Sequence, residues 1–320
     1  MKNICLVGCG NVGSRHLQAI AKLPFSTDVE IVEPSKDSQE LGKKRLAEIR
    51  QNGDSRFSWY SKIEELRHKP DLTIVATTAT DRADLLCRLA DMGHARFLIE
   101  KMVCQSDEEY GMVVDRFHQR NAKGWVNTNP RCFSSYQKLK ESFAGSTDIH
   151  FSVTASNVSA LGTNTIHYMD LFSYFTNDYN IKLNGELLIN KVFPNKRGSH
   201  LMEFAGTITG RTRGGSSMVL TFLPSDKLPT IVNIVGNDKH VMIDETNQKA
   251  TDMINGKEMD FSYEHASTLT TSISKDILEK DNCGLSTLED SRVLHTEIFR
   301  MFNSHVNKVT GGKVELCPIT

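Results

Sequence analysis

The sequence lacks three features, and each absence excludes a class of protein. Its 320 residues contain no run approaching about eighteen apolar residues, so we expect no transmembrane helix and no membrane partner. The 38 basic side chains do not outnumber the 39 acidic ones, so nucleic acid is not an expected partner. The seven cysteines show no close zinc or redox spacing. We therefore predict free thiols in a cytoplasmic protein with no metal site.

The amino terminus is basic and then apolar over residues 1–7, which superficially resembles a signal peptide. The apolar run stops at Gly8, and a glycine-rich segment follows at once. This arrangement indicates a first β-strand rather than a targeting segment. A chain of 320 residues is too long for one small domain, so we expect two domains.

Strand and helix patterns alternate over the first 125 residues. We predict strands at residues 4–7, 28–32, 57–60, 72–76, 97–99 and 125–126. Helices are predicted at residues 14–23, 38–51, 62–67, 81–92 and 106–119, with Gly93 ending the fourth of them. This alternation is typical of a doubly wound parallel sheet, so residues 1–125 are predicted to form a Rossmann domain of the α/β class.

The pattern changes to a period of two from residue 149 onward. Strands are predicted at residues 149–155, 187–192, 203–208, 216–222, 230–235 and 240–243, with turn residues between them. We therefore expect residues 126–320 to form an α+β domain with a large, mostly antiparallel open sheet. A helix around His167 should cover one face of this sheet. A long amphipathic helix at residues 288–305 is expected to pack back on the first domain.

Residues 8–13 have the sequence Gly-Cys-Gly-Asn-Val-Gly, directly after a strand and at the start of a helix. A G-x-G-x-x-G pattern is weak alone and strong in this context. Its glycines allow a tight turn, let the backbone approach a pyrophosphate and let the helix pack closely on the strand. The free N–H groups at the helix start would face the phosphates. We predict cofactor contacts from Gly8, Gly10, Asn11, Val12 and Gly13.

Glu33 lies twenty positions after Gly13, at the end of the second predicted strand. A carboxylate there accepts hydrogen bonds from ribose hydroxyls and repels a 2′-phosphate, so we expect NAD rather than NADP. Arg15, Ser35 and Lys36 are nearby groups that could hold a 2′-phosphate, so NADP stays open as the alternative.

Five segments in order resemble the glucose–fructose oxidoreductase, inositol dehydrogenase and rhizopine-catabolism family (GFO/IDH/MocA). The resemblance covers nearly the whole chain, and the five segments together are more specific than any one of them. They are residues 13–16, 97–102, 129–131, 162–170 and 287–291.

The resemblance implies a role for the segment that ends the fifth predicted strand. Lys101 would contact both the nicotinamide and the substrate, and Glu100, Thr77 and Thr78 would line the cofactor site. A lysine at the carboxyl end of a parallel strand can move a proton at a reacting oxygen. The alternative is a surface lysine at a strand end. Met102 and Thr78 stand where many members have proline, and Arg82 where many have histidine.

The resemblance also implies that His167 is an active-site histidine, whereas its apolar helix alone favours a core histidine. Thr163 lies four residues earlier, where members that oxidise polyols commonly carry an aspartate. A threonine can only hydrogen-bond, so this pair is incomplete, and Thr163 is predicted to contact substrate. Asn129 and Arg131 would bind substrate or fix the domain junction, and Asp170 would be structural.

The sequence therefore predicts an NAD(P)-dependent oxidoreductase acting on a hydroxyl or carbonyl carbon of a sugar, cyclitol or sugar derivative. For an acidic or nucleotide-linked sugar, Arg82, Arg131 and Lys101 are candidate anion contacts. One alternative is a cofactor-binding sensor or regulatory protein with little catalysis. Another is dehydration or epimerisation through transient oxidation. The resemblance also implies a homo-oligomer, dimer or tetramer, formed partly through the open sheet face.

Overall fold

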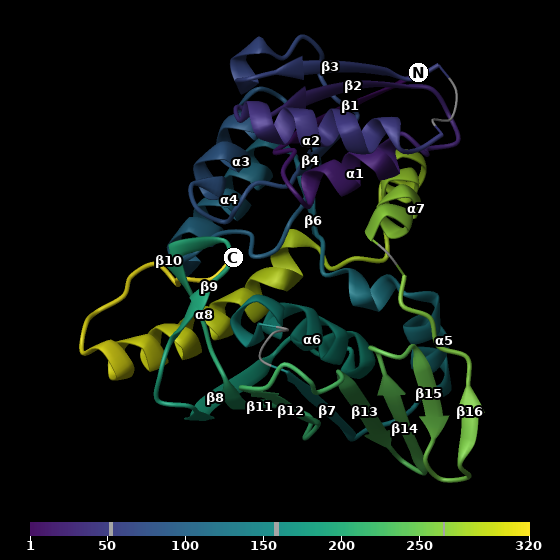
Figure 1. Cartoon of the computed structure of the whole chain (residues 1–320), viewed down its shortest axis with the longest axis vertical. Coiled ribbons are helices and arrows are strands. Elements are labelled where there is room, and N and C mark those ends of the chain that lie inside the picture. Colours follow the sequence, from purple (N-terminus) through teal and green to yellow (C-terminus); the bar gives the residue numbers. More distant parts are fainter. Residues whose placement is uncertain (51–53, 157–159, 265) are drawn as a thin grey trace. The chain divides into compact units, whose positions relative to one another are not determined.

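The computed structural model describes residues 1–50, 54–156, 160–264 and 266–320, which form two compact units (Figure 1). The first unit contains Met1–Cys104, Glu108–Asn129 and Glu264–Leu288. The second contains Gln105–Asp107, Pro130–Tyr263 and Glu289–Thr320. A late segment of the chain is thus counted with the amino-terminal unit. Packing of the last helix on the first domain stays a prediction.

The first unit is built on a parallel sheet of six strands in the order β3-β2-β1-β4-β5-β6. The strands are β1 (Lys2–Val7), β2 (Thr27–Val32), β3 (Arg56–Tyr60), β4 (Leu72–Val75), β5 (Arg96–Ile99) and β6 (Lys123–Val126). β4 is buried along its whole length, as expected for a parallel strand covered on both faces. The order reverses between β1 and β4, where doubly wound sheets bind their ligands. The predicted Rossmann sheet is confirmed.

The helices of the first unit are α1 (Gly13–Ile20), α2 (Lys36–Ala47), η1 (Ile63–Glu65), α3 (Arg82–Asp91), α4 (Asp107–Arg120) and α7 (Ala266–Lys280). The predicted helices are found, although the third is a short 3₁₀ turn. The predicted end of the second, Gln51, lies outside the described residues, and α2 itself ends at Ala47. Gly93 has a φ of +89°, the left-handed conformation expected after a helix end. The sequence did not predict α7, which packs against α1.

The second unit contains a sheet of eight strands in the order β16-β15-β14-β13-β7-β12-β11-β8. Neighbouring strands are antiparallel except β7 and β12, which are parallel. The strands are β7 (Ile149–Ser156), β8 (Ile181–Leu188), β11 (Gly206–Thr212), β12 (Ser217–Leu223), β13 (Ile231–Gly236), β14 (Lys239–Asp244), β15 (Lys249–Asp252) and β16 (Lys257–Met259). The predicted large, mostly antiparallel sheet is confirmed.

Two strand predictions in this unit were wrong. The strand expected at residues 187–192 is β8, which begins at Ile181 and ends at Leu188. The strand expected at residues 203–208 is two elements, because β10 (Gly198–Glu203) ends before β11 begins. Gly206 has a φ of +110° and lies close against the backbone of β8, so the chain turns there. β10 pairs instead with β9 (Phe193–Asn195) in a separate two-stranded sheet.

The helices and turns of the second unit include η2 (Asn129–Cys132), α5 (Ser134–Ser142), α6 (Leu161–Thr176) and α8 (Leu288–Thr310). α6 packs against β7, β12 and β10, which confirms the predicted helix on the sheet. Most of α6 is buried, and its partly accessible side chains include Asn164, His167 and Tyr174. No helix in the described part of the chain is both long and apolar enough to cross a membrane.

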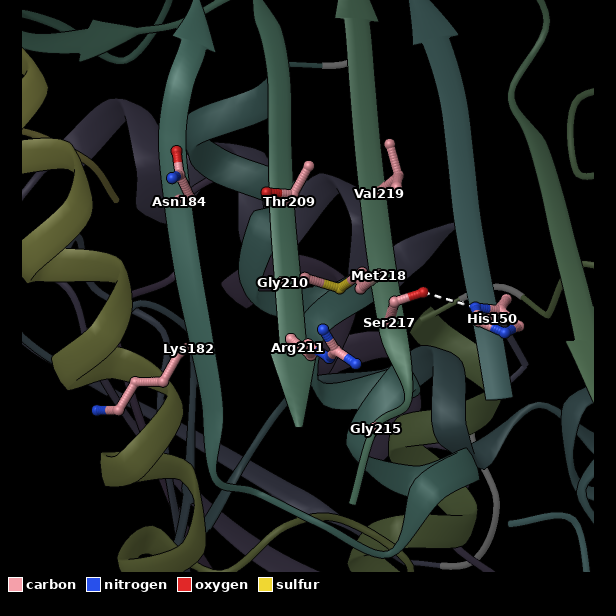
Figure 2. A pocket seen from close by; sticks show the side chains of 10 residues that line it. All are labelled: His150, Lys182, Asn184, Thr209, Gly210, Arg211, Gly215, Ser217, Met218 and Val219. Carbon is pink, nitrogen blue, oxygen red and sulfur yellow. Dashed lines mark hydrogen bonds between the residues drawn. The ribbon is translucent and has the colours of Figure 1, made fainter. Parts of the chain in front are cut away.

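The other face of the eight-stranded sheet is open within this unit. A hollow of about 490 Å³ lies on this face across the strands β7, β12, β11 and β8, and Figure 2 shows the residues that line it. His150 Nδ1 and Ser217 Oγ lie 2.7 Å apart at one side of it. Further along β12, Val219 and Leu223 are 37% and 41% exposed.

Candidate functional site

The glycine loop at the carboxyl end of β1 has two crowded glycines and one open one. A Cβ on Gly13 would lie 2.0 Å from the Gly8 carbonyl oxygen, and a Cβ on Gly8 would lie 2.9 Å from the backbone nitrogen of Thr77. These two glycines let α1 and the end of β4 pack directly against the loop. A Cβ on Gly10 would meet no atom within 4 Å. The backbone at Gly10 therefore borders open space, as a pyrophosphate site requires.

Glu33 is buried at the end of β2, and its carboxylate is fixed beside this loop. The backbone N–H of Cys9 donates to Oε2 at 2.7 Å, and that of Ser35 donates to Oε1 at 2.9 Å. Burial and the neighbouring Glu33 raise the pKa of the Cys9 thiol to about 12, against a smaller opposite effect of Arg45. The loop thus carries a neutral thiol and lies beside one oriented carboxylate.

Arg45 of α2 also contacts the loop, which the sequence did not predict. Its Nη1 donates to the Asn11 carbonyl oxygen at 2.7 Å and to Ser14 Oγ at 2.6 Å. Asn11 and Val12 are themselves exposed. A guanidinium bonded to the loop fixes its conformation and adds positive charge near an expected phosphate site.

Glu100 follows β5 and is the centre of a buried network. His16 Nε2 lies 2.9 Å from Glu100 Oε1, and the side-chain amide of Asn127 donates to the same oxygen. His16 Nδ1 lies 2.9 Å from the Thr270 hydroxyl of α7. Burial raises the pKa of Glu100, but the bonds from His16 and Asn127 and the charges of His16 and Lys101 outweigh it, lowering the pKa to about 2.

We expect Glu100→Gln to remove a pH-dependent part of the stability. The pKa of Glu100 is depressed from 4.5 to about 2, so its contribution is complete above pH 4.5 and is lost as the pH falls towards 2. At neutral pH that contribution is about 3 kcal/mol. Urea unfolding of both proteins between pH 3.5 and 7 should give a stability difference that shrinks on acidification. A difference independent of pH would contradict this assignment.

Arg82 is not placed to bind a substrate anion, so that interpretation is corrected. Its side chain is 1% exposed, and its guanidinium donates to the carbonyl oxygens of Thr77, Glu100 and Met102. A buried guanidinium is tolerated only with such acceptors. Arg82 therefore ties the loop after β4 to the segment after β5, which carries Lys101.

The structure brings the other candidate cofactor residues to the same edge of the first unit's sheet. Thr77 and Thr78 follow β4, the first half-buried and the second exposed. Lys101 follows β5 and is 7% exposed, directly after the anchored Glu100. These positions at the carboxyl ends of neighbouring parallel strands fit a nicotinamide coenzyme extending from the glycine loop.

In the second unit, Thr163 and His167 lie one turn apart on α6. Thr163 is 8% exposed and donates its hydroxyl to the carboxylate of Glu203, while His167 is half-buried. Sequence reasoning missed Glu203, because nothing in the pattern of residues 198–208 indicates that this side chain turns towards α6. The threonine that replaces the expected aspartate is therefore bonded to a carboxylate from elsewhere in the chain.

Arg131 is held by side chains of its own unit. Its Nη1 donates to Asp170 Oδ1 at 3.2 Å and to the Tyr179 hydroxyl at 2.9 Å, and its guanidinium lies 4.9 Å from the centre of the Tyr174 ring. Asp170 is fully buried. These contacts favour a structural role for Arg131. Asn129 is half-buried at the start of η2.

Solved structures of similar fold include an oxidoreductase from Agrobacterium radiobacter in complex with NAD⁺, L-tartaric acid and magnesium. It is 16% identical with a TM-score of 0.75, over 98% of each chain. UDP-N-acetylglucosamine 3-dehydrogenase GnnA from Acidithiobacillus ferrooxidans is 14% identical with a TM-score of 0.69, over 94% of this chain and 96% of that one. The WlbA dehydrogenase from Bordetella pertussis, in complex with NADH and UDP-GlcNAcA, is 15% identical with a TM-score of 0.68, over 93% and 95%.

Comparison with protein-family models and with curated protein sequences gave no match. At such low identities the structural likeness establishes the fold alone. The chain therefore shares the fold of these oxidoreductases over nearly its whole length.

Proposed function

We propose that this protein is an NAD-dependent oxidoreductase of the GFO/IDH/MocA type. It transfers a hydride between the nicotinamide and a hydroxyl or carbonyl carbon of a sugar, cyclitol or sugar derivative. The observation that carries the proposal is the open backbone at Gly10 beside the oriented carboxylate of Glu33. Similar structures in complex with NAD⁺ and NADH support it.

The residues present fit a nicotinamide dinucleotide. Gly8, Gly10 and Gly13 form the pyrophosphate loop, and Glu33 accepts the ribose hydroxyls. A fixed carboxylate at that position repels a 2′-phosphate, which favours NAD over NADP. Arg15 is one of the groups that could hold a 2′-phosphate. Its guanidinium donates to the Gln18 side chain at 2.8 Å.

Bound NAD supplies the hydride acceptor or donor, and the protein must handle the accompanying proton. We assign that task to Lys101, with His167 as the second acid–base group. Glu100 and Arg82 fix the backbone on both sides of Lys101 through buried hydrogen bonds. Thr163 contacts the substrate or positions His167.

Substrates with an acidic or nucleotide-linked sugar are the first candidates for this protein. Proteins of similar structure include a UDP-N-acetylglucosamine 3-dehydrogenase and complexes with UDP-GlcNAcA or L-tartaric acid. Purified protein should be assayed with NAD⁺ and NADP⁺ against these compounds and myo-inositol, following absorbance of the reduced coenzyme. Coenzyme binding without turnover of any compound would favour the sensor alternative. Product formation without net coenzyme reduction would favour epimerisation or dehydration.

We also propose that the protein self-associates through the open face of the eight-stranded sheet. On strands β11 and β12 this face combines the exposed Val219 and Leu223 with small hydroxyl side chains such as Thr207 and Thr221. Exposed apolar residues among small uncharged ones are a feature of interfaces between identical subunits.

Val219→Glu is therefore expected to convert the assembly to smaller species, because a charge would be buried without a partner. Sedimentation velocity at several concentrations measures this directly. Met112→Glu, a change of a similarly exposed apolar residue on α4, is the matched control and should leave the assembly unchanged. A monomeric wild-type protein, or equal effects of both changes, would contradict the proposed interface.

A further inference from the structure

Glu203 is a buried carboxylate whose hydrogen bonds converge on the start of α6. Glu203 is only 5% exposed. Oε2 accepts the backbone N–H of Gly162 at 2.8 Å and that of Thr163 at 3.4 Å. Oε1 accepts the Thr163 hydroxyl and the side-chain amide of Asn195 at 2.9 Å. Oε2 is thus bonded to the first turn of α6, and Oε1 is bonded both to that turn and to β9.

The structure around Glu203 places its carboxylate at the start of α6. The β9–β10 hairpin carries both Asn195 and Glu203 and stands apart from the large sheet. A Cβ on Gly162 would lie 2.9 Å from Glu203 Oε2 and 3.0 Å from the Phe204 ring, so a glycine allows the close approach. The N-terminus of a helix also favours a negative charge, which stabilises ionised Glu203 there.

The bond to Glu203 decides what the Thr163 hydroxyl can offer to other groups. A hydroxyl has one proton to donate and two lone pairs, and an ionised carboxylate can only accept. Since the Thr163 proton is donated to Glu203, its oxygen can act towards a further partner only as an acceptor. His167 lies four residues later, on the same face of α6. An imidazole N–H is a hydrogen-bond donor that the Thr163 oxygen can accept from.

We propose that Glu203 is a positioning residue that acts through Thr163 to orient His167 and to favour its protonated form. The resemblance leads one to expect an aspartate at position 163 of α6. In this protein the carboxylate comes instead from Glu203, at the end of β10. The assignment of His167 to catalysis rests on the proposed function. The coupling between Glu203 and His167 does not, so it can be measured without any substrate.

Other charged groups that contact α6 have different partners. Asp170, on the helix itself, receives the guanidinium of Arg131 from η2. Glu245, which follows β14, accepts the hydroxyls of Tyr136 at 2.7 Å and Tyr168 at 2.9 Å. At the carboxyl end of α6, the Lys140 ammonium donates to the Phe175 carbonyl oxygen. Glu203 is bonded to Thr163, which lies one turn before His167 on α6.

The test is an NMR titration of the histidine side chains in protein labelled with ¹⁵N-histidine, with His167 assigned from the His167→Gln spectrum. Glu203→Gln keeps the size of the side chain and removes its charge. We expect it to move the His167 titration midpoint down by on the order of half a pH unit or more. Glu245→Gln is the matched control, because it also removes a carboxylate bonded to α6 and should leave the midpoint unchanged.

A second pair of variants separates charge from structure. Thr163→Asp alone puts a second carboxylate beside Glu203, so it should destabilise the protein and lower its unfolding midpoint in urea. Thr163→Asp combined with Glu203→Gln leaves one carboxylate at the same place. It should restore both the stability and the His167 midpoint.

An unchanged His167 midpoint in a folded Glu203→Gln protein would overturn the proposal, as would an equal shift in Glu245→Gln. Failure of the double variant to restore the midpoint would do the same. If these results hold while no compound is oxidised or reduced, the coupling stands and the proposed function fails. If substrate turns over while the His167 midpoint is insensitive to Glu203, the proposed function stands and the coupling fails.

Discussion

Gly10→Ala should weaken NAD binding by roughly a hundredfold while leaving the stability of the protein unchanged. A Cβ at Gly10 meets no protein atom within 4 Å, and the residue does not have a positive φ, so alanine fits the uncomplexed protein. In the proposed site the added methyl group would occupy the space of the coenzyme phosphates and remove their hydrogen bonds to the backbone. Charged hydrogen bonds contribute about 1.5–3 kcal/mol each, which sets the expected factor.

Gly13→Ala is the informative comparison, because it should act on the fold itself. Its Cβ would lie 2.0 Å from the Gly8 carbonyl oxygen, so the glycine loop and α1 would have to move apart. Forced overpacking of this kind costs about 1–3 kcal/mol or more. Urea unfolding and calorimetric NAD titration of both variants separate the two effects. Wild-type affinity in Gly10→Ala would show that the phosphates bind elsewhere.

Lys101→Ala should lower kcat by about 10²–10⁴-fold, the usual contribution of a general acid–base group. The dissociation constant for NAD should stay nearly unchanged, since the proposed pyrophosphate and ribose contacts come from other residues. Lys101 is buried, so Lys101→Met, which keeps most of the side-chain volume, tests whether lost packing explains the result.

The control for this variant is Lys44→Ala, which removes an exposed lysine from α2 and should have full activity. The assay is steady-state turnover with the best substrate from the panel. Normal kcat in both Lys101 variants would remove Lys101 from the chemistry. Loss in the alanine variant alone would assign it a packing role instead.

The sequence predicted the Rossmann unit well because its signals are local. Buried parallel strands read as short apolar runs, and the glycine loop joins one of them to a helix over only six residues. The helix α7 was missed for the opposite reason. Residues 267–274 are mostly serine and threonine, which have low helix propensity. This helix depends on packing against α1, where the Thr271 hydroxyl donates to the Ala19 carbonyl oxygen.

The site shows the same division between local and distant signals. Gly10 and Glu33 could be predicted from spacing, since each has a fixed place relative to a strand. Glu203 could not, because its partner Thr163 is forty residues away and the hairpin that carries it does not follow the strand pattern. Arg82 was misread because a cation near an expected anion site suggests ligand binding. Its burial among carbonyl oxygens is visible only in the fold.

The most direct test of the proposed dinucleotide site is a calorimetric titration of the wild-type protein with NAD⁺, NADH, NADP⁺ and NADPH. The open backbone at Gly10 and the carboxylate of Glu33 predict binding of NAD⁺ and NADH, with at least about tenfold weaker binding of the phosphorylated coenzymes. A clear preference for NADP⁺ or NADPH would refute the role given to Glu33. No heat with any of the four would contradict the dinucleotide site itself.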